Sequence, residues 1–157
     1  LSRRVAEGAC QVKTIDFQTT SVAEFARMLC GVPEQKEAPK APEFVPTIAY
    51  VFGAYRAKCE WEVKRNIEAA ESVALQLWRM GHAVICPHKN TAHFGGALGL
   101  PDEVWLRGDL ALIARCDFLV GVSGWEQSAG SRDEVEFAKS KGIPVYESLA
   151  AYVASQK

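Results

Sequence analysis

The chain has 157 residues, of which 48% are hydrophobic and 24% are charged, and its formal net charge is −1. These values fit one globular domain with a sizeable core, and the near-neutral charge without a long basic run argues against general nucleic-acid binding. No apolar run approaches the roughly 20 residues that a membrane-spanning helix needs, so we expect no membrane partner.

Five cysteines are scattered along the chain without a CxxC pair. An odd and dispersed set predicts reduced thiols rather than a disulfide framework. The first ten residues, LSRRVAEGAC, also lack the apolar segment of a secretory signal. Both features favour a cytoplasmic protein.

Residues 1–46 differ from the rest of the chain and are predicted to form an N-terminal extension. The segment Ser21–Gly31 has the pattern of a short helix, with Ser21 as its cap and Glu24 at the capping-box position. The next segment, Val32–Pro46, holds four prolines and mixed charges, which is typical of a linker or a strap on the surface.

From Thr47 onward, short apolar runs alternate with segments of helical periodicity. The predicted strands, expected to be buried, are Thr47–Gly53, His82–Pro87, Asp117–Val122 and Ile143–Tyr146. The predicted helices are Glu60–Gly81, with Trp78 on its apolar stripe, Pro101–Cys116, with Pro101 near its first position, Ser131–Lys141 and a terminal helix from about Ser148. The alternation predicts one α/β domain over residues 47–157, with an open parallel sheet of about four to five strands and helices on both faces, as in flavodoxin-like and Rossmann-like folds.

Ligands of open parallel sheets bind at the carboxyl ends of the strands. Three loops follow predicted strands and should therefore converge there, namely Gly53–Cys59, Pro87–Leu100 and Ser123–Ser131. This convergence is the main reason to expect a small-molecule site.

Two carboxylates, Glu134 and Asp109, are candidates for chemistry at that site. Asp133, Glu134 and Glu136 fall in about the first turn of the helix that begins at Ser131, where an acid either stabilises the helix dipole or acts as a nucleophile or general base. Asp109 lies inside a predicted helix, where it is either a solvated or capping residue or a general acid. Two carboxylates that flank one bond are the usual equipment for glycosidic cleavage.

The loops contain further candidates. Gly53 lets the backbone approach a ligand and Arg56 can bind phosphate or carboxylate, but neither a dinucleotide fingerprint nor a P-loop is present. The spacing of Cys86, His88 and His93 does not match a zinc pattern, so we expect ligand contacts or loop hydrogen bonds there and no metal. Trp125 either stacks on a base or covers the core.

These pieces together resemble the nucleoside 2-deoxyribosyltransferase superfamily, and most of all a subgroup of small phage and bacterial proteins related to deoxynucleoside 5′-monophosphate N-glycosidases. The similarity covers about Thr47 to Tyr146. It is carried by AYVFGAYRA, NIEAAESVALQLWRMGHAVICPHKNTAHF, GDLALIARCDFLVGVSGWE and GSRDEVEFAKSKGIPVY.

The resemblance implies cleavage of the N-glycosidic bond of a (deoxy)nucleoside or its 5′-monophosphate, by hydrolysis or by deoxyribosyl transfer, without a cofactor. It implies that Glu134 attacks the anomeric carbon, that Asp109 protonates the base and that Tyr50 lies beside the nucleophile. The expected substrate-binding residues are Gly53, Tyr55, Arg56, His88, Asn90, His93, Trp125, Gly130 and Ser131. Relatives of this kind also imply a homodimer or a larger homo-oligomer.

The chain departs from the family pattern at three positions, one of which is Glu136, where a small residue is common in the family helix. Ala54 stands where the nucleotidases have a serine that touches phosphate, and Ser128 stands where the transferases have an additional aspartate. Two alternatives therefore stay open: a non-catalytic nucleotide-binding or sensor module, and an N-glycosidase for ribonucleotides or NAD-type substrates.

Overall fold

The computed structural model describes residues 40–157, and Ala41–Lys157 form one compact unit. The predicted helix Ser21–Gly31 and residues 32–39 of the predicted linker lie outside the described residues. Residues 40–47 have no regular secondary structure. Their last part nevertheless belongs to the domain, because the Val45 amide donates to the carbonyl oxygen of Gly81 at 2.8 Å.

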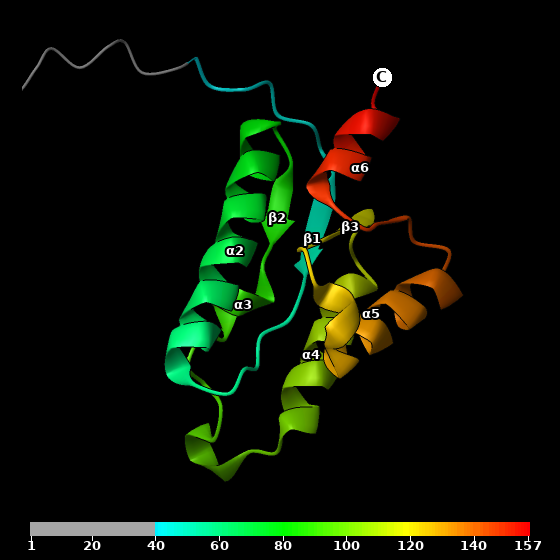
Figure 1. The fold of residues 1–157 in the computed structure, drawn as a ribbon. Coiled ribbons are helices and arrows are strands. Elements are labelled where there is room, and N and C mark those ends of the chain that lie inside the picture. Colours follow the sequence, from blue (N-terminus) through cyan, green and yellow to red (C-terminus); the bar gives the residue numbers. More distant parts are fainter. Residues whose placement is uncertain (1–39) are drawn as a thin grey trace, which may run out of the picture. The chain divides into compact units, whose positions relative to one another are not determined.

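The described part of the chain contains a four-stranded parallel sheet (Figure 1). Its strands are β1 (Ile48–Phe52), β2 (Ala83–Ile85), β3 (Phe118–Gly121) and β4 (Val145–Tyr146). The spatial order is β2-β1-β3-β4, and in this register Tyr50 of β1 lies between Ile85 of β2 and Leu119 of β3. The chain leaves β1 first toward β2 and later returns to its other side at β3, so the carboxyl ends of β1 and β3 form the crevice where such sheets bind ligands.

Helices connect the strands. They are α2 (Glu60–Arg79), α3 (Pro87–Asn90), α4 (Asp102–Ile113), α5 (Ala129–Ser140) and α6 (Leu149–Ser155), with short 3₁₀ turns η1 (Ala97–Gly99) and η2 (Trp125–Gln127). None of the helices in residues 40–157 has the combination of length and hydropathy needed to cross a membrane.

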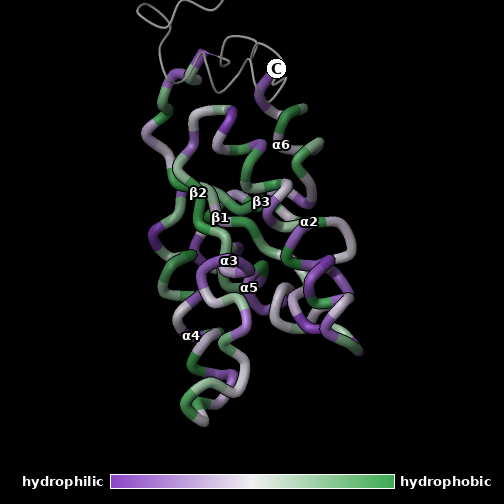
Figure 2. Tube along the Cα trace, turned by 90° about the vertical axis from the view of Figure 1, so that its left-hand side faces the viewer, coloured by the Kyte–Doolittle hydropathy of each residue, from purple (hydrophilic) through white to green (hydrophobic). Residues whose placement is uncertain are grey.

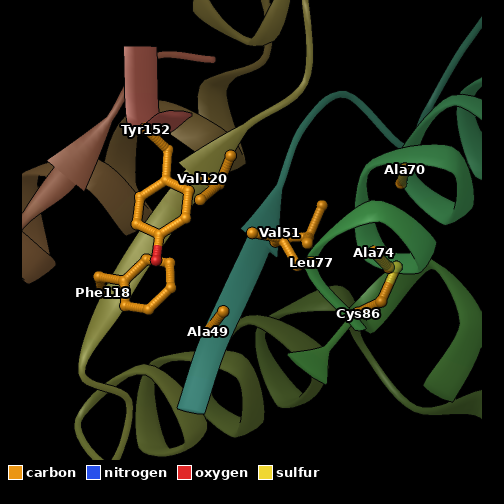
Figure 3. Close-up of a cluster of buried hydrophobic side chains, with 9 residues drawn as sticks. All are labelled: Ala49, Val51, Ala70, Ala74, Leu77, Cys86, Phe118, Val120 and Tyr152. Atoms are coloured by element: carbon orange, nitrogen blue, oxygen red, sulfur yellow. The ribbon is translucent and has the colours of Figure 1, made fainter. Parts of the chain in front are cut away.

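Successive side chains of β1 face opposite sides of the sheet, and each side has its own core. Ala49 and Val51 pack with Leu77 of α2 and Tyr152 of α6 (Figure 3). The Tyr152 ring stacks on Phe118 with a centroid separation of 4.6 Å. This layer holds α2 and α6 against one face of the sheet.

The opposite face carries α4 and α5. Tyr50 and Phe52 of β1 pack there with Ile113 of α4 and with Val135 and Ala138 of α5. The sheet is thus covered by helices on both faces, as the sequence predicts. In Figure 2 the strands are mainly hydrophobic, while the helices around them mix hydrophilic and hydrophobic residues.

Several predicted boundaries were wrong. The second strand is only Ala83–Ile85, because Pro87 starts α3. It is half-buried because β2 is an edge strand of the sheet. Trp78 is 48% exposed rather than part of the apolar stripe, since the helix buries the narrower face of Ile67, Ala70, Ala74 and Leu77. Pro101 is the N-cap residue of α4, and the helix begins at Asp102.

The start of α5 differs from the prediction in a way that matters for the site. The helix begins at Ala129, two residues before Ser131, and the Ser128 hydroxyl caps it by accepting the Ser131 amide at 3.3 Å. Asp133, Glu134 and Glu136 therefore lie beyond the first turn, which contains no acid. A helix-dipole role for Glu134 loses support, because that effect falls off within the first turn.

Candidate functional site

A cavity of about 1120 Å³ opens at the carboxyl ends of β1 and β3. All three predicted loops contribute to its wall, through residues 53–57 after β1, Pro87, His88 and Thr91 near α3, and residues 127–131 around the start of α5. The helix α4 supplies Trp105 and Asp109. The topology thus brings together segments that are far apart in the sequence.

Glu134 and Tyr50 form a buried hydrogen-bonded pair beside this cavity. The Tyr50 hydroxyl donates to Glu134 Oε1 at 2.7 Å, although the residues are 84 positions apart. Tyr50 is fully buried, and Glu134, which lines the cavity, is 7% exposed. The contact exists because Tyr50 points from β1 toward the face of the sheet that α5 covers.

Burial dominates the electrostatics of this pair. It raises the pKa of Glu134 from 4.5 to about 7, and the hydrogen bond from Tyr50 opposes this because it stabilises the ionised carboxylate. The negative charges of Asp109 and Asp133 raise the Glu134 pKa further. Burial also raises the pKa of Tyr50 far above its usual 10, so its hydroxyl keeps its proton and stays a donor.

Asp109 lies on α4 and lines the same cavity as Glu134. Burial raises its pKa from 3.8 to about 6. Since the two carboxyl groups influence each other, their titration belongs to the pair, which holds on average one proton between about pH 6 and 7. Both carboxyl groups therefore keep their protons to a higher pH than ordinary carboxylic acids do.

The loop after β1 is held close to the sheet. A Cβ atom at Gly53 would lie 2.9 Å from Val122 Cβ, so only glycine fits there without movement. The Tyr55 carbonyl oxygen accepts from Asn66 Nδ2 at 3.2 Å, and the Tyr55 hydroxyl accepts from the His93 amide at 2.9 Å. Arg56 forms an ion pair with Asp102 at the first turn of α4.

His88 is buried at the cavity wall. Its Nε2 lies 3.1 Å from the Ala54 carbonyl oxygen, and burial lowers its pKa, so the ring is neutral near pH 7. Its Nδ1 has no hydrogen-bond partner among residues 40–157. Asn90 and His93, also predicted to bind substrate, are not among the lining residues, and His93 contributes only its backbone amide to Tyr55.

Trp125 belongs to the core side of the site. It does not line the cavity but packs edge-on against Phe52, with ring centroids 5.2 Å apart. The structure therefore supports the interpretation in which Trp125 covers the core and does not stack on a base. Gly130 and Ser131 do line the cavity, and the Ser131 hydroxyl is buried without a partner among the described residues.

Trp105, which the sequence did not single out, is a further aromatic residue of the cavity wall beside Tyr55 and Phe94. Trp105 packs edge-on against Phe94, which also lines the cavity, with ring centroids 5.8 Å apart. A signal was present, because Trp105 and Asp109 are four residues apart and so share one face of α4. Asn66 and Asp102 were missed as well, and their partners Tyr55 and Arg56 lie on a loop whose conformation the sequence does not specify.

Across residues 40–157, no group of three or more His, Cys, Asp and Glu residues is arranged to hold a metal ion. Cys86 and His88 are both buried, and His88 Nε2 contacts the carbonyl oxygen of Ala54 in the loop after β1.

The chain matches a protein-family model. No curated protein matches the chain. Residues 55–147, which include α4, α5 and the cavity loops except for Gly53 and Ala54, match the family described as a domain of unknown function, DUF4406. Since this match covers more than half of the 157 residues, the chain belongs to the DUF4406 family.

Proposed function

We propose that this protein cleaves the N-glycosidic bond of a (deoxy)nucleoside or its 5′-monophosphate through a covalent glycosyl–glutamate intermediate. The observation that carries the proposal is the buried Glu134 carboxyl group, oriented by the Tyr50 hydroxyl and facing the same cavity as Asp109. Two carboxyl groups with raised pKa values, one buried and one half-buried, at a cavity large enough for a nucleoside are typical equipment for glycoside cleavage.

In the first step, ionised Glu134 attacks the anomeric carbon while the bond to the base breaks and the base takes the electron pair. Glu134 also stabilises the positive charge that develops on the sugar in the transition state. Asp109 donates its proton to the leaving base. In the second step, water or a second base attacks the same carbon, the bond to Glu134 breaks with its electron pair returning to the carboxylate, and ionised Asp109 takes the proton of the attacking group, which yields hydrolysis or transfer.

The reactive state needs the shared proton on Asp109. Because the pKa of Glu134 is the higher of the two, only the minor fraction of the singly protonated pairs carries the proton on Asp109. The hydrogen bond from Tyr50 raises this fraction, because it favours the ionised form of Glu134. Tyr50 therefore acts as a positioning residue that also tunes the nucleophile.

The test is to incubate the purified protein with deoxynucleosides, ribonucleosides, their 5′-monophosphates and NAD. Chromatography then measures the free base released from each substrate. Glu134→Gln keeps an oxygen for the Tyr50 hydroxyl but removes the nucleophile, and we expect it to abolish base release. Mass spectrometry of the quenched wild-type reaction should show an adduct of one sugar, with or without phosphate, on Glu134.

Glu136→Gln is the matched control, because Glu136 is exposed on the same helix and does not line the cavity. This variant should keep wild-type activity. Full activity in Glu134→Gln would refute the proposed role of Glu134. Binding of these ligands without release of base in any combination would favour a non-catalytic nucleotide-binding module instead.

A further inference from the structure

We propose that the cavity accepts nucleosides that lack a 5′-phosphate and discriminates against their 5′-monophosphates, and that Asp102 sets this preference. The inference rests on the proposed function and narrows its substrate from two classes to one. It depends on the charges of the cavity wall and on what the two cationic side chains of that wall already contact.

The charge on the cavity wall is one-sided. Among the described lining residues, two carry guanidinium groups and six carry carboxyl groups, namely Glu62, Asp102, Glu103, Asp109, Asp133 and Glu134. When Asp109 and Glu134 share one proton, five negative charges remain against two positive charges, an excess of three. A phosphate dianion entering this cavity meets net repulsion, whereas an uncharged nucleoside does not.

Arg56 is the cation placed to bind a phosphate, because it lies in the loop after β1 at the mouth of the crevice. Its guanidinium group is already paired with the Asp102 carboxylate. Asp102 thus occupies the position that a phosphate would need, and its negative charge would repel a phosphate that displaced it. The uncharged Ala54 side chain beside Arg56 offers no hydrogen-bond donor.

Two further donor groups near the cavity already have a contact, whereas the Ser131 hydroxyl and Trp105 Nε1 have no partner among the described residues and carry no charge that would attract a phosphate. The Arg65 guanidinium lies 5.0 Å from the ring centroid of Trp61, which is 64% exposed and does not line the cavity. At the start of α5, the Ser131 amide donates to the Ser128 hydroxyl at 3.3 Å. An anion at this helix end would have to replace an existing cap. The uncharged 5′-hydroxyl of an unphosphorylated sugar can bind without replacing this cap.

The test compares each of four 2′-deoxynucleosides with its 5′-monophosphate, by kcat/KM for base release and, in parallel, by dissociation constants from calorimetry. We expect wild-type protein to prefer the nucleoside, and the preference to weaken as salt is added. Asp102→Asn frees Arg56 and removes one repelling charge. Exposed ion pairs such as this one contribute up to about a factor of five to an equilibrium constant. We therefore expect the ratio of kcat/KM for the monophosphate to kcat/KM for the nucleoside to rise by about fivefold in Asp102→Asn.

Two variants control this result. Adding Arg56→Gln to Asp102→Asn should return the ratio toward the wild-type value, because the freed guanidinium is then absent. Glu136→Gln removes an exposed carboxylate away from the cavity and should leave the ratio unchanged. Circular dichroism and thermal unfolding show whether each variant is folded.

The outcomes separate this inference from the proposed function. A wild-type preference for monophosphates, an unchanged ratio in folded Asp102→Asn, or failure to bind either class would overturn the inference. Tighter binding of nucleosides with no release of base would leave the inference standing and refute the proposed function. Faster base release from monophosphates than from nucleosides would support the proposed function and overturn the inference.

Discussion

Replacing Glu134 by Gln should make the protein more stable at alkaline pH, because the wild-type carboxyl group is ionised there in a buried site. Its pKa is about 7 in the folded protein against an ordinary value of 4.5, so the folded state binds more protons than the unfolded chain between these pH values. The free energy of unfolding of the wild type therefore falls as pH rises from about 4.5 to about 7, and this contribution is constant outside that window.

The magnitude follows from the difference between the two pKa values. A difference of about 2.5, between about 7 and 4.5, corresponds to about 3 kcal/mol at about 1.4 kcal/mol per pKa unit. The side chain is 7% exposed, so solvent screens little of this cost. Glu134→Gln removes the cost. We expect its stability relative to wild type to be about 2 to 3 kcal/mol more favourable at pH 8 than at pH 5.

The assay is urea denaturation followed by tryptophan fluorescence at pH 5, 6, 7 and 8. The pH dependence is the diagnostic quantity, because any packing penalty of the glutamine side chain is the same at every pH. Glu136→Gln, an exposed position on the same helix, should show a much smaller dependence. If the difference between wild type and Glu134→Gln were constant between pH 5 and pH 8, the reasoning about a buried ionised carboxylate would be refuted.

Two further predictions concern the carboxyl pair and the backbone. The pH profile of base release should be bell-shaped with a maximum between about pH 6 and 7, and Tyr50→Phe should lower that maximum and move the alkaline limb to higher pH, because losing the hydrogen bond raises the Glu134 pKa. An unshifted profile in Tyr50→Phe would contradict this role. Gly81→Ala should destabilise the fold by about 1 to 3 kcal/mol in urea denaturation, because Gly81 has a φ of +93° and a Cβ atom there would overlap the Glu43 carbonyl oxygen. Gly108→Ala, inside α4 with free space around it, should instead stabilise by about 0.5 to 1 kcal/mol, and equal effects of the two substitutions would count against the argument.

Much of the architecture could be predicted because it depends on local pattern. The apolar runs at β1 and β3 and the helical periodicity of α2 and α5 identify alternating strands and helices. Alternation of this kind leaves few topologies other than a parallel sheet with helices on both faces. The same topology places the three loops at one edge, so the location of the cavity was also predictable.

Boundaries and individual contacts were less predictable, because they depend on neighbours in space. The half-burial of β2 follows from its edge position, and the early start of α5 follows from the Ser128 cap. Trp125 packs on Phe52 instead of lining the cavity, whereas Trp105, for which the sequence offered no expectation, lies on the cavity-facing side of α4.

The sequence by itself determined the class of fold, the edge of the sheet where a ligand would bind, and Glu134 and Asp109 as the acids worth testing. Only the tertiary structure decided that Tyr50 donates to Glu134 across 84 residues, that Asp102 pairs with Arg56, and that both acids have raised pKa values. The reason is physical: periodicity and capping act over a few residues along the chain, whereas burial and pairing of charges depend on which elements pack together.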